Sequence, residues 1–143
     1  MIRQSLAAFA LATLVGCSAS SSINPFASRG GGEQAQMAAY AATAHYPSDA
    51  RPSSDIHAGA IVDARENSIK VANFSDQPMR DVNVWVNGSF VYHVSMIPAH
   101  GSVTVNPDQM FDASGENMAK VKATPSRVEL QTGDRLYSLG TAM

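Results

Sequence analysis

Cysteine is almost absent from this sequence. Cys17 is the only one among 143 residues, so the chain cannot form an internal disulfide, and nothing after residue 17 offers a thiol for catalysis or metal binding. Charged residues are also few, at 15%, and the formal net charge is −2. The ten Lys and Arg residues form no basic run, which argues against a nucleic-acid-binding surface.

A long hydrophobic run is missing as well. The apolar stretch 6–16 is only eleven residues long, whereas a membrane-spanning helix needs about 20. It follows Arg3 and ends in small residues, a pattern typical of a secretory signal peptide.

The end of this run carries a specific motif. Leu14-Val15-Gly16-Cys17 resembles the lipobox of bacterial lipoproteins. The resemblance implies a signal peptide over residues 1–16 that is cut before Cys17, with a covalent diacylglycerol on the Cys17 thiol, an N-acyl lipid on its amino group, and no other cofactor. The alternative is an ordinary secretory signal that is cut near Ala19 and carries Cys17 away.

The lipoprotein resemblance also predicts a location in the cell envelope. Two or three acyl chains at one residue hold a protein stably on a membrane. In Gram-negative cells the sorting pattern retains lipoproteins with Asp after the cysteine in the inner membrane. Ser18 stands there in this chain, so we expect an outer-membrane lipoprotein that faces the periplasm or the cell surface, if the source is Gram-negative.

The composition divides the rest of the chain in two. Residues 17–66 are rich in Ser, Ala, Gly and Pro and are predicted to be a flexible tether. Within them, residues 33–44 contain good helix formers, which predicts either a short helix docked on the domain or a partly helical linker. Residues 67–143 are predicted to form a single β-domain.

The β-domain is expected to be a small immunoglobulin-like β-sandwich of about six or seven strands, so the fold class is all-β. Alternating apolar residues and turn signals predict strands at 68–74, 102–106 and 118–123, and hairpins at 81–97 and 127–139. The last hairpin, with a two-residue Gly133-Asp134 loop, is expected to have one dry face and one wet face that carries Glu129, Gln131 and Ser138.

The hairpin at 81–97 has an unusual pattern. A two-residue loop at Asn87-Gly88 would place Trp85 opposite Phe90. One face would then be all valine, and the other would carry Trp85, Phe90 and Tyr92. Either the aromatic face is the core of the sandwich, or it is displayed to a ligand. The second apolar face then needs the 37–44 segment or an external partner as its cover.

A further resemblance covers Ile69–Val105. Asn73, Pro78, Asn87-Gly88, Pro98 and Gly101 occupy turns in a pattern that resembles immunoglobulin-like modules of bacterial cell-surface proteins, including the fibronectin type III and CARDB-type groups. Such modules serve in adhesion, spacing and assembly, and the resemblance implies no catalytic residues.

No catalytic constellation is visible, and we expect a protein that is not an enzyme. His93 and His100 lack the spacing of a known metal motif, and a polar contact and an exposed turn residue explain them more simply. Asp108, Asp112 and Glu116 suggest either a calcium loop or a solvated turn, and the turn is preferred, so no metal site is predicted.

These features together predict a function. We expect a lipid-anchored envelope lipoprotein with a non-catalytic binding or assembly role, whose partner is another envelope protein or cell-wall glycan and not nucleic acid. The alternative is a carbohydrate- or peptidoglycan-binding module that uses Trp85, Phe90 and Tyr92.

Overall fold

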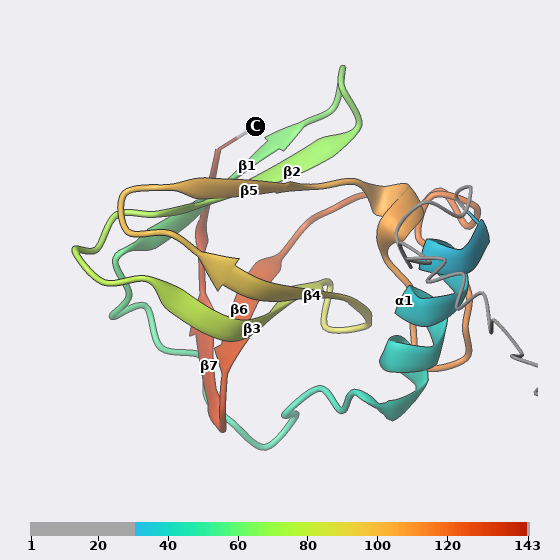
Figure 1. The fold of residues 1–143 in the computed structure, drawn as a ribbon, viewed down its shortest axis with the longest axis horizontal. Helices are drawn as coiled ribbons and strands as arrows, with labels where there is room; N and C mark the ends of the chain where they lie inside the picture. The colour runs from blue at the N-terminus through green and yellow to red at the C-terminus, as the bar shows by residue number, and fades with distance from the viewer. Residues whose placement is uncertain (1–30, 143) are drawn as a thin grey trace, which may run out of the picture.

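The computed structural model describes residues 31–142, which form two four-stranded β-sheets packed face to face and one α-helix (Figure 1). The elements in chain order are α1 (Gly31–Thr43), β1 (Ala58–Asp63), β2 (Ser68–Asn73), β3 (Met79–Val86), β4 (Phe90–Ile97), β5 (Ser102–Val105), the 3₁₀ turn η1 (Pro107–Gln109), β6 (Val128–Thr132), β7 (Arg135–Ser138) and β8 (Gly140–Ala142). The predicted all-β sandwich is confirmed.

The strand order is that of an immunoglobulin-like sandwich. One sheet has the order β5-β2-β1-β8 and the other β4-β3-β6-β7, and every pair is antiparallel except β1 with β8. If β1 to β7 are lettered A, B, C, C′, E, F and G, the sheets read E-B-A and C′-C-F-G, the arrangement of immunoglobulin domains. The structure has eight strands: β1 and β8 are additional to the strands expected from the sequence, and the strand expected at 118–123 is absent.

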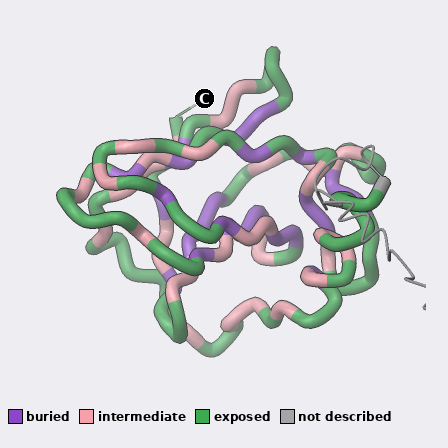
Figure 2. Tube along the Cα trace, viewed as in Figure 1, coloured by how far each residue is buried: buried purple, intermediate pink, exposed green. Residues whose placement is uncertain are grey.

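The core between the sheets follows from residue alternation, as Figure 2 shows by the concentration of buried positions on the strands. In β2 the prediction that Ile69, Val71 and Asn73 share the inner face is confirmed, because all three are buried. The facing sheet contributes apolar side chains from its two central strands and from β4; these are Val82, Val84, Val86, Phe90, Val94, Val128 and Leu130.

The register predicted for the β3–β4 hairpin is wrong by one residue. Val86 pairs with Phe90, not with Ser89, and Trp85 pairs with Val91. Asn87 and Gly88 have positive φ values of 55° and 68°, as the predicted turn requires, but Ser89 is an extra unpaired residue beside them. Because side chains alternate, this one residue moves Phe90 and Tyr92 to the opposite face from Trp85.

The pairing predicted for the last hairpin is confirmed. Leu130 lies opposite Tyr137 across the Gly133-Asp134 turn. The wet face expected for it is wrong, however, because Glu129 on that face is fully buried. A charged residue in a strand usually indicates an exposed face, but here the segment around Tyr46 covers it.

Two boundaries also differ from the predictions. Residues 118–123 form turns and not a strand, and they belong to a long connection from β5 to β6 that sends Met110 and Met118 into the core. The packed unit begins before residue 67, since α1 and β1 both lie inside the 17–66 segment expected to be a tether. β1 is a central strand of its sheet, so this part of the chain belongs to the domain.

Candidate functional site

The outer face of the β4-β3-β6-β7 sheet is covered by α1 and the chain that follows it. A second cluster of buried apolar residues lies there, separate from the main core; its members are Ala41, Trp85, Val91, Phe111 and Leu136. Met37, Ala38, Tyr40 and Ala44 of the helical segment and Tyr46 and Ala50 after it pack against this cluster. Residues 37–50, here called the lid, therefore cover the second apolar face of the hairpin. Of the two predictions for residues 33–44, the docked helix is confirmed.

A chain of polar side chains runs beneath the lid, and its hydrogen-bond directions can be deduced. Trp85 Nε1 can only donate, and it lies 2.7 Å from Gln131 Oε1, which must accept. Asn83 Nδ2 donates to the same oxygen at 3.4 Å, which leaves Asn83 Oδ1 as an acceptor.

That acceptor is shared between the lid and the sheet. Tyr40 Oη of α1 donates to Asn83 Oδ1 at 2.7 Å, and His93 Nδ1 lies 3.1 Å from the same oxygen. The His93 ring therefore carries its proton on Nδ1, since the oxygen has no proton to offer. The Tyr40 and His93 rings also contact each other in a tilted arrangement, with centroids 4.9 Å apart and an interplanar angle of 38°. The lid is thus held by directional polar contacts as well as by apolar packing.

Glu129 lies under the second half of the lid and is fully buried. Its Oε2 accepts a hydrogen bond from Tyr46 Oη at 2.9 Å and forms an ion pair with Arg127 Nε at 3.2 Å. Its Oε1 has no hydrogen-bond partner among the described residues. Burial, the hydrogen bond to Glu129 and its negative charge together raise the pKa of Tyr46, against the opposing effect of Arg127. A buried carboxylate is costly unless it is paired, so this contact ties Tyr46 to the sheet.

The Asn87-Gly88 turn holds another part of the chain in place. Asn87 Oδ1 accepts hydrogen bonds from the backbone nitrogens of Ser126 and Arg127, and Asn87 Nδ2 donates to the Thr124 carbonyl at 2.9 Å. A Cβ on Gly88 would lie 2.6 Å from the Arg127 guanidinium and 3.3 Å from the Tyr46 ring. Glycine is therefore favoured by its positive φ and by the limited space between Arg127 and Tyr46.

The three aromatic residues predicted as a ligand site do not share a surface. Trp85 is 2% exposed and lies under the lid, whereas Phe90 is 8% exposed and belongs to the core between the sheets. Tyr92 is half-buried and packs against that same core. The common aromatic face is therefore a wrong prediction, and its cause is the extra residue Ser89. Cys17, the predicted lipid-attachment residue, lies outside the described residues.

The polar residues considered for metal binding are engaged elsewhere. His100 Nε2 lies 2.7 Å from Asp76 Oδ1, so His100 and His93 have different partners. Asp112 accepts hydrogen bonds from the Ser114 hydroxyl and from the backbone nitrogens of Ser114 and Glu116. Burial opposes these bonds, but they prevail and lower the pKa of Asp112. Within residues 31–142 no cluster of three or more metal-ligating side chains is present.

A groove of about 760 Å³ lies at one end of the sandwich. It lies between the β1–β2 hairpin and the 107–125 connection, and its lining is mostly apolar, with Ile61, Val62, Ile69, Pro107, Ala123 and Pro125. Its charged lining residues are Asp63, Arg65 and Lys122, and neither Arg65 nor Lys122 forms an ion pair with a described residue. Its volume falls within the range of small-ligand and side-chain pockets, roughly 300–1,000 Å³.

Sequence reasoning missed both the groove and the polar residues under the lid. The groove joins segments about fifty residues apart, one of them assigned to the tether and the other to a strand, so no local pattern marks it. Glu129 carried one overlooked signal, since it alternates with Val128 and Leu130 in a strand whose neighbour Trp85 already needed a cover.

No helix in the described part of the chain is long and apolar enough to cross a membrane. Comparison with known protein families, with curated proteins and with solved structures finds no match for this chain.

Proposed function

We propose that this chain is a lipid-anchored lipoprotein of the bacterial cell envelope whose β-sandwich has a non-catalytic binding or assembly role. The anchor rests on the Leu14-Val15-Gly16-Cys17 motif, with covalent lipid at Cys17. The location follows from Ser18, which favours the outer membrane in a Gram-negative cell. The partner is another envelope protein, and its contact surface on this chain is the groove between the β1–β2 hairpin and residues 107–125.

The observation that carries the binding role is the apolar lining of that groove. Ile61 is 51% exposed on its border, although large apolar side chains on a small domain are usually buried. A concave surface with apolar walls, on which two cations outnumber the single carboxylate of Asp63, suits an apolar segment of a partner that is flanked by acidic residues.

The short connection to the anchor sets where this partner can be. Residues 18–30 separate Cys17 from the start of α1. Thirteen residues span at most about 45 Å even when fully extended. The partner would therefore be bound no further from the lipid headgroups than about 45 Å plus the width of the domain.

Carbohydrate or peptidoglycan binding is the weaker proposal. Trp85 would have to stack on a sugar ring, and the lid covers it. The test is the emission of Trp85, the only tryptophan. Blue-shifted emission that glycan fragments leave unchanged would end this proposal, whereas a red shift on adding glycan would restore it.

The anchor is tested by the full-length Cys17→Ser variant in the native host. We expect it to lose labelling by radioactive palmitate and to leave the membrane fraction, while a Ser20→Ala control keeps both. If the Cys17→Ser variant stays in the membrane fraction, the lipoprotein proposal is wrong. A Ser18→Asp variant tests the sorting, because it should move the protein to the inner membrane of a Gram-negative cell.

The groove is tested with a photo-crosslinking amino acid at Ala123 in the same full-length chain. We expect a crosslink to one envelope protein, and we expect Ile61→Arg to abolish it by placing a charge in the groove. The same crosslinker at Asp134, in the exposed β6–β7 turn, is the matched control. Equal yields at the two positions would refute the groove as the contact surface.

A further inference from the structure

The two sheets end in four edge strands, which differ in how far their outer edges are blocked. β7 is bonded by Ser53, whose nitrogen donates to Leu136 O and whose carbonyl accepts from Ser138 N. β4 is bonded at one end, where Val91 N donates to Phe111 O. The rest of the β4 edge carries no further backbone bond to a described segment. β8 has only three residues. Exposed edges invite pairing with other chains, and proteins usually block them in such ways.

The edge of β5 is open along its whole length. Asn73 N donates to Gly101 O, which shows that odd-numbered residues of this strand direct their backbone groups toward β2. The backbone groups of Ser102 and Thr104 therefore point away from the sheet, and they bond to no other backbone or side chain among residues 31–142. Neither β5 nor its flanking residues Gly101 and Asn106 carries a charge, and no proline interrupts the strand.

This open edge is complementary to itself. An antiparallel copy with its twofold axis at Val103 would set Ser102 opposite Thr104 of the second copy in two hydrogen-bonded pairs, which gives about four backbone bonds. The two Val103 side chains would meet at the centre of the junction, on the core side. Val103 is only half-buried in the single chain, although its neighbour Val105 is fully buried, so this contact would complete its burial.

We propose that two copies of this chain associate through their β5 strands and form one continuous eight-stranded sheet across a twofold axis. The uncharged strand is what permits self-pairing, because a lysine or glutamate in β5 would face its own copy across the junction. The outer side chains of Ser102 and Thr104 form the Ser–Thr cross-strand pairs that antiparallel sheets favour. The inference is independent of the groove, which lies at the end of the sandwich and contains no β5 residue.

Disulfide crosslinking tests the register. The Val103→Cys variant of the full-length chain, purified in a large excess of detergent micelles, should form a dimer rapidly under mild oxidation, because the two positions are directly opposite. Ser102→Cys is the matched control, since each copy would place it opposite Thr104 and not opposite itself. The unsubstituted chain, whose only thiol is Cys17, gives the background. Equal dimer yields at positions 102 and 103 would overturn the proposal.

Sedimentation velocity tests the backbone contacts. Ser102→Pro removes the outward N–H from each copy, and the first residue of an edge strand tolerates proline. We expect self-association at least about fivefold weaker than in the unsubstituted chain, from the loss of two of the hydrogen bonds. Ser102→Ala keeps the N–H and should associate as the unsubstituted chain does. A Thr104→Lys variant gives a second test without proline, because it places a charge at the junction. An unsubstituted chain that is monomeric at millimolar concentration would overturn the proposal.

Discussion

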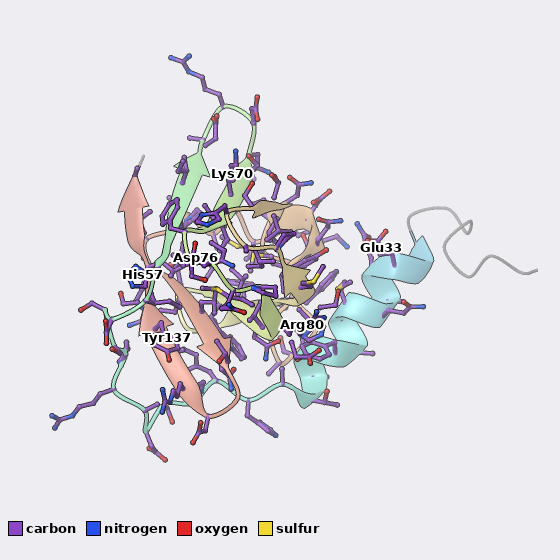
Figure 3. The ribbon with its side chains drawn as sticks, turned by 60° about the vertical axis from the view of Figure 1, so that its left-hand side comes forward. Glu33, His57, Lys70, Asp76, Arg80 and Tyr137 are labelled. Carbon is purple, nitrogen blue, oxygen red and sulfur yellow. The ribbon has the colours of Figure 1, made fainter. Side chains whose placement is uncertain are left out.

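The two outer faces of this sandwich differ in what they carry. The outer face of the β4-β3-β6-β7 sheet has large and polar residues, including Trp85, Leu136 and the buried Glu129, and the lid covers it. The outer face of β5-β2-β1-β8 has mostly small or polar residues, such as Gly59, Ala72 and Thr104, with Ile61 as an exposed apolar exception, and no described helix covers it. Figure 3 places Lys70 on this bare sheet and Glu33 on α1, in separate parts of the molecule.

This difference explains the role of the segment before β1. Two sheets of this size bury one core between them, and a sandwich needs nothing more if its outer faces are polar. Here one outer face is apolar enough to require a third layer, and residues 37–50 provide it. The lid is thus an integral part of the fold. Substitutions on the covered face should therefore lower the free energy of unfolding more than substitutions on the bare face.

The largest difference in the loss of unfolding free energy is expected between Trp85→Ala and Ile61→Ala. Trp85 is 2% exposed under the lid, and its truncation should lower the free energy of unfolding by about 3–4 kcal/mol. Ile61 is 51% exposed on the bare sheet, and its truncation should cost less than about 1 kcal/mol. Urea unfolding followed by circular dichroism measures both. Similar losses would mean that the lid does not bury Trp85 in solution.

The next largest loss of stability is expected when the ion pair between Arg127 and Glu129 under the lid is broken. Arg127→Gln leaves the buried Glu129 carboxylate with only Tyr46 as a partner, and the free energy of unfolding should fall by about 2 kcal/mol. That cost comes from an unpaired charge, so the double variant Arg127→Gln/Glu129→Gln should recover most of it. Additive losses in the double variant would contradict a direct coupling.

Alanine substitutions at two turn glycines distinguish the cost of backbone strain from the cost of disturbed packing against the lid. Gly88 and Gly133 both have positive φ, and alanine at either should cost about 1 kcal/mol through strain. Only a Cβ at Gly88 would contact Arg127 and Tyr46, whereas that at Gly133 would meet open space. Gly88→Ala should therefore be the more destabilising by roughly 0.5–1 kcal/mol in the same unfolding measurement. The reverse order would place the Asn87-Gly88 turn away from the lid.

The smallest loss of unfolding free energy is expected for Tyr46→Phe, and this loss depends on pH. Loss of the hydrogen bond to Glu129 should cost about 1 kcal/mol at neutral pH. The pKa of Tyr46 is raised above its ordinary value of 10.0, so the folded chain holds this proton more tightly than the unfolded chain. The corresponding stability is complete below pH 10 and is lost as the pH rises through the raised pKa. The difference between Tyr46→Phe and the unsubstituted chain should therefore shrink above pH 10. A constant difference from pH 7 to pH 11 would show that Tyr46 is not coupled to Glu129.

The sequence predicted those parts of the fold that depend on local pattern. Alternation identified the inner face of β2, and turn residues located both hairpins, because these signals act within a few residues. The hairpin register failed at Ser89, since the same Asn-Gly pair serves loops of two or three residues. The burial of Glu129 could not be foreseen from its strand, because its partner Tyr46 lies 83 residues away.

In the candidate site, too, only the features with a local sequence signal could be predicted. The need for a cover over the hairpin was visible in its doubly apolar pattern, and the helix that supplies it was one of the two predictions for residues 33–44. The grouping of Trp85 with Phe90 and Tyr92 depended on the register and failed with it. The groove depends on contacts between distant segments, which alternation in a single sequence does not encode.

The lid also constrains the order in which the chain can fold. Synthesis releases residues 37–50 before every strand of the sandwich, yet the surface on which they dock includes β6 and β7 near the other end of the chain. Contacts between such distant residues form slowly, because the intervening chain must first be ordered. We therefore expect the lid to dock only after the last hairpin has formed, and Trp85 to stay accessible to water until then. Quenching of Trp85 fluorescence during refolding would time this step, with protection of Trp85 as the final event in the formation of the native fold.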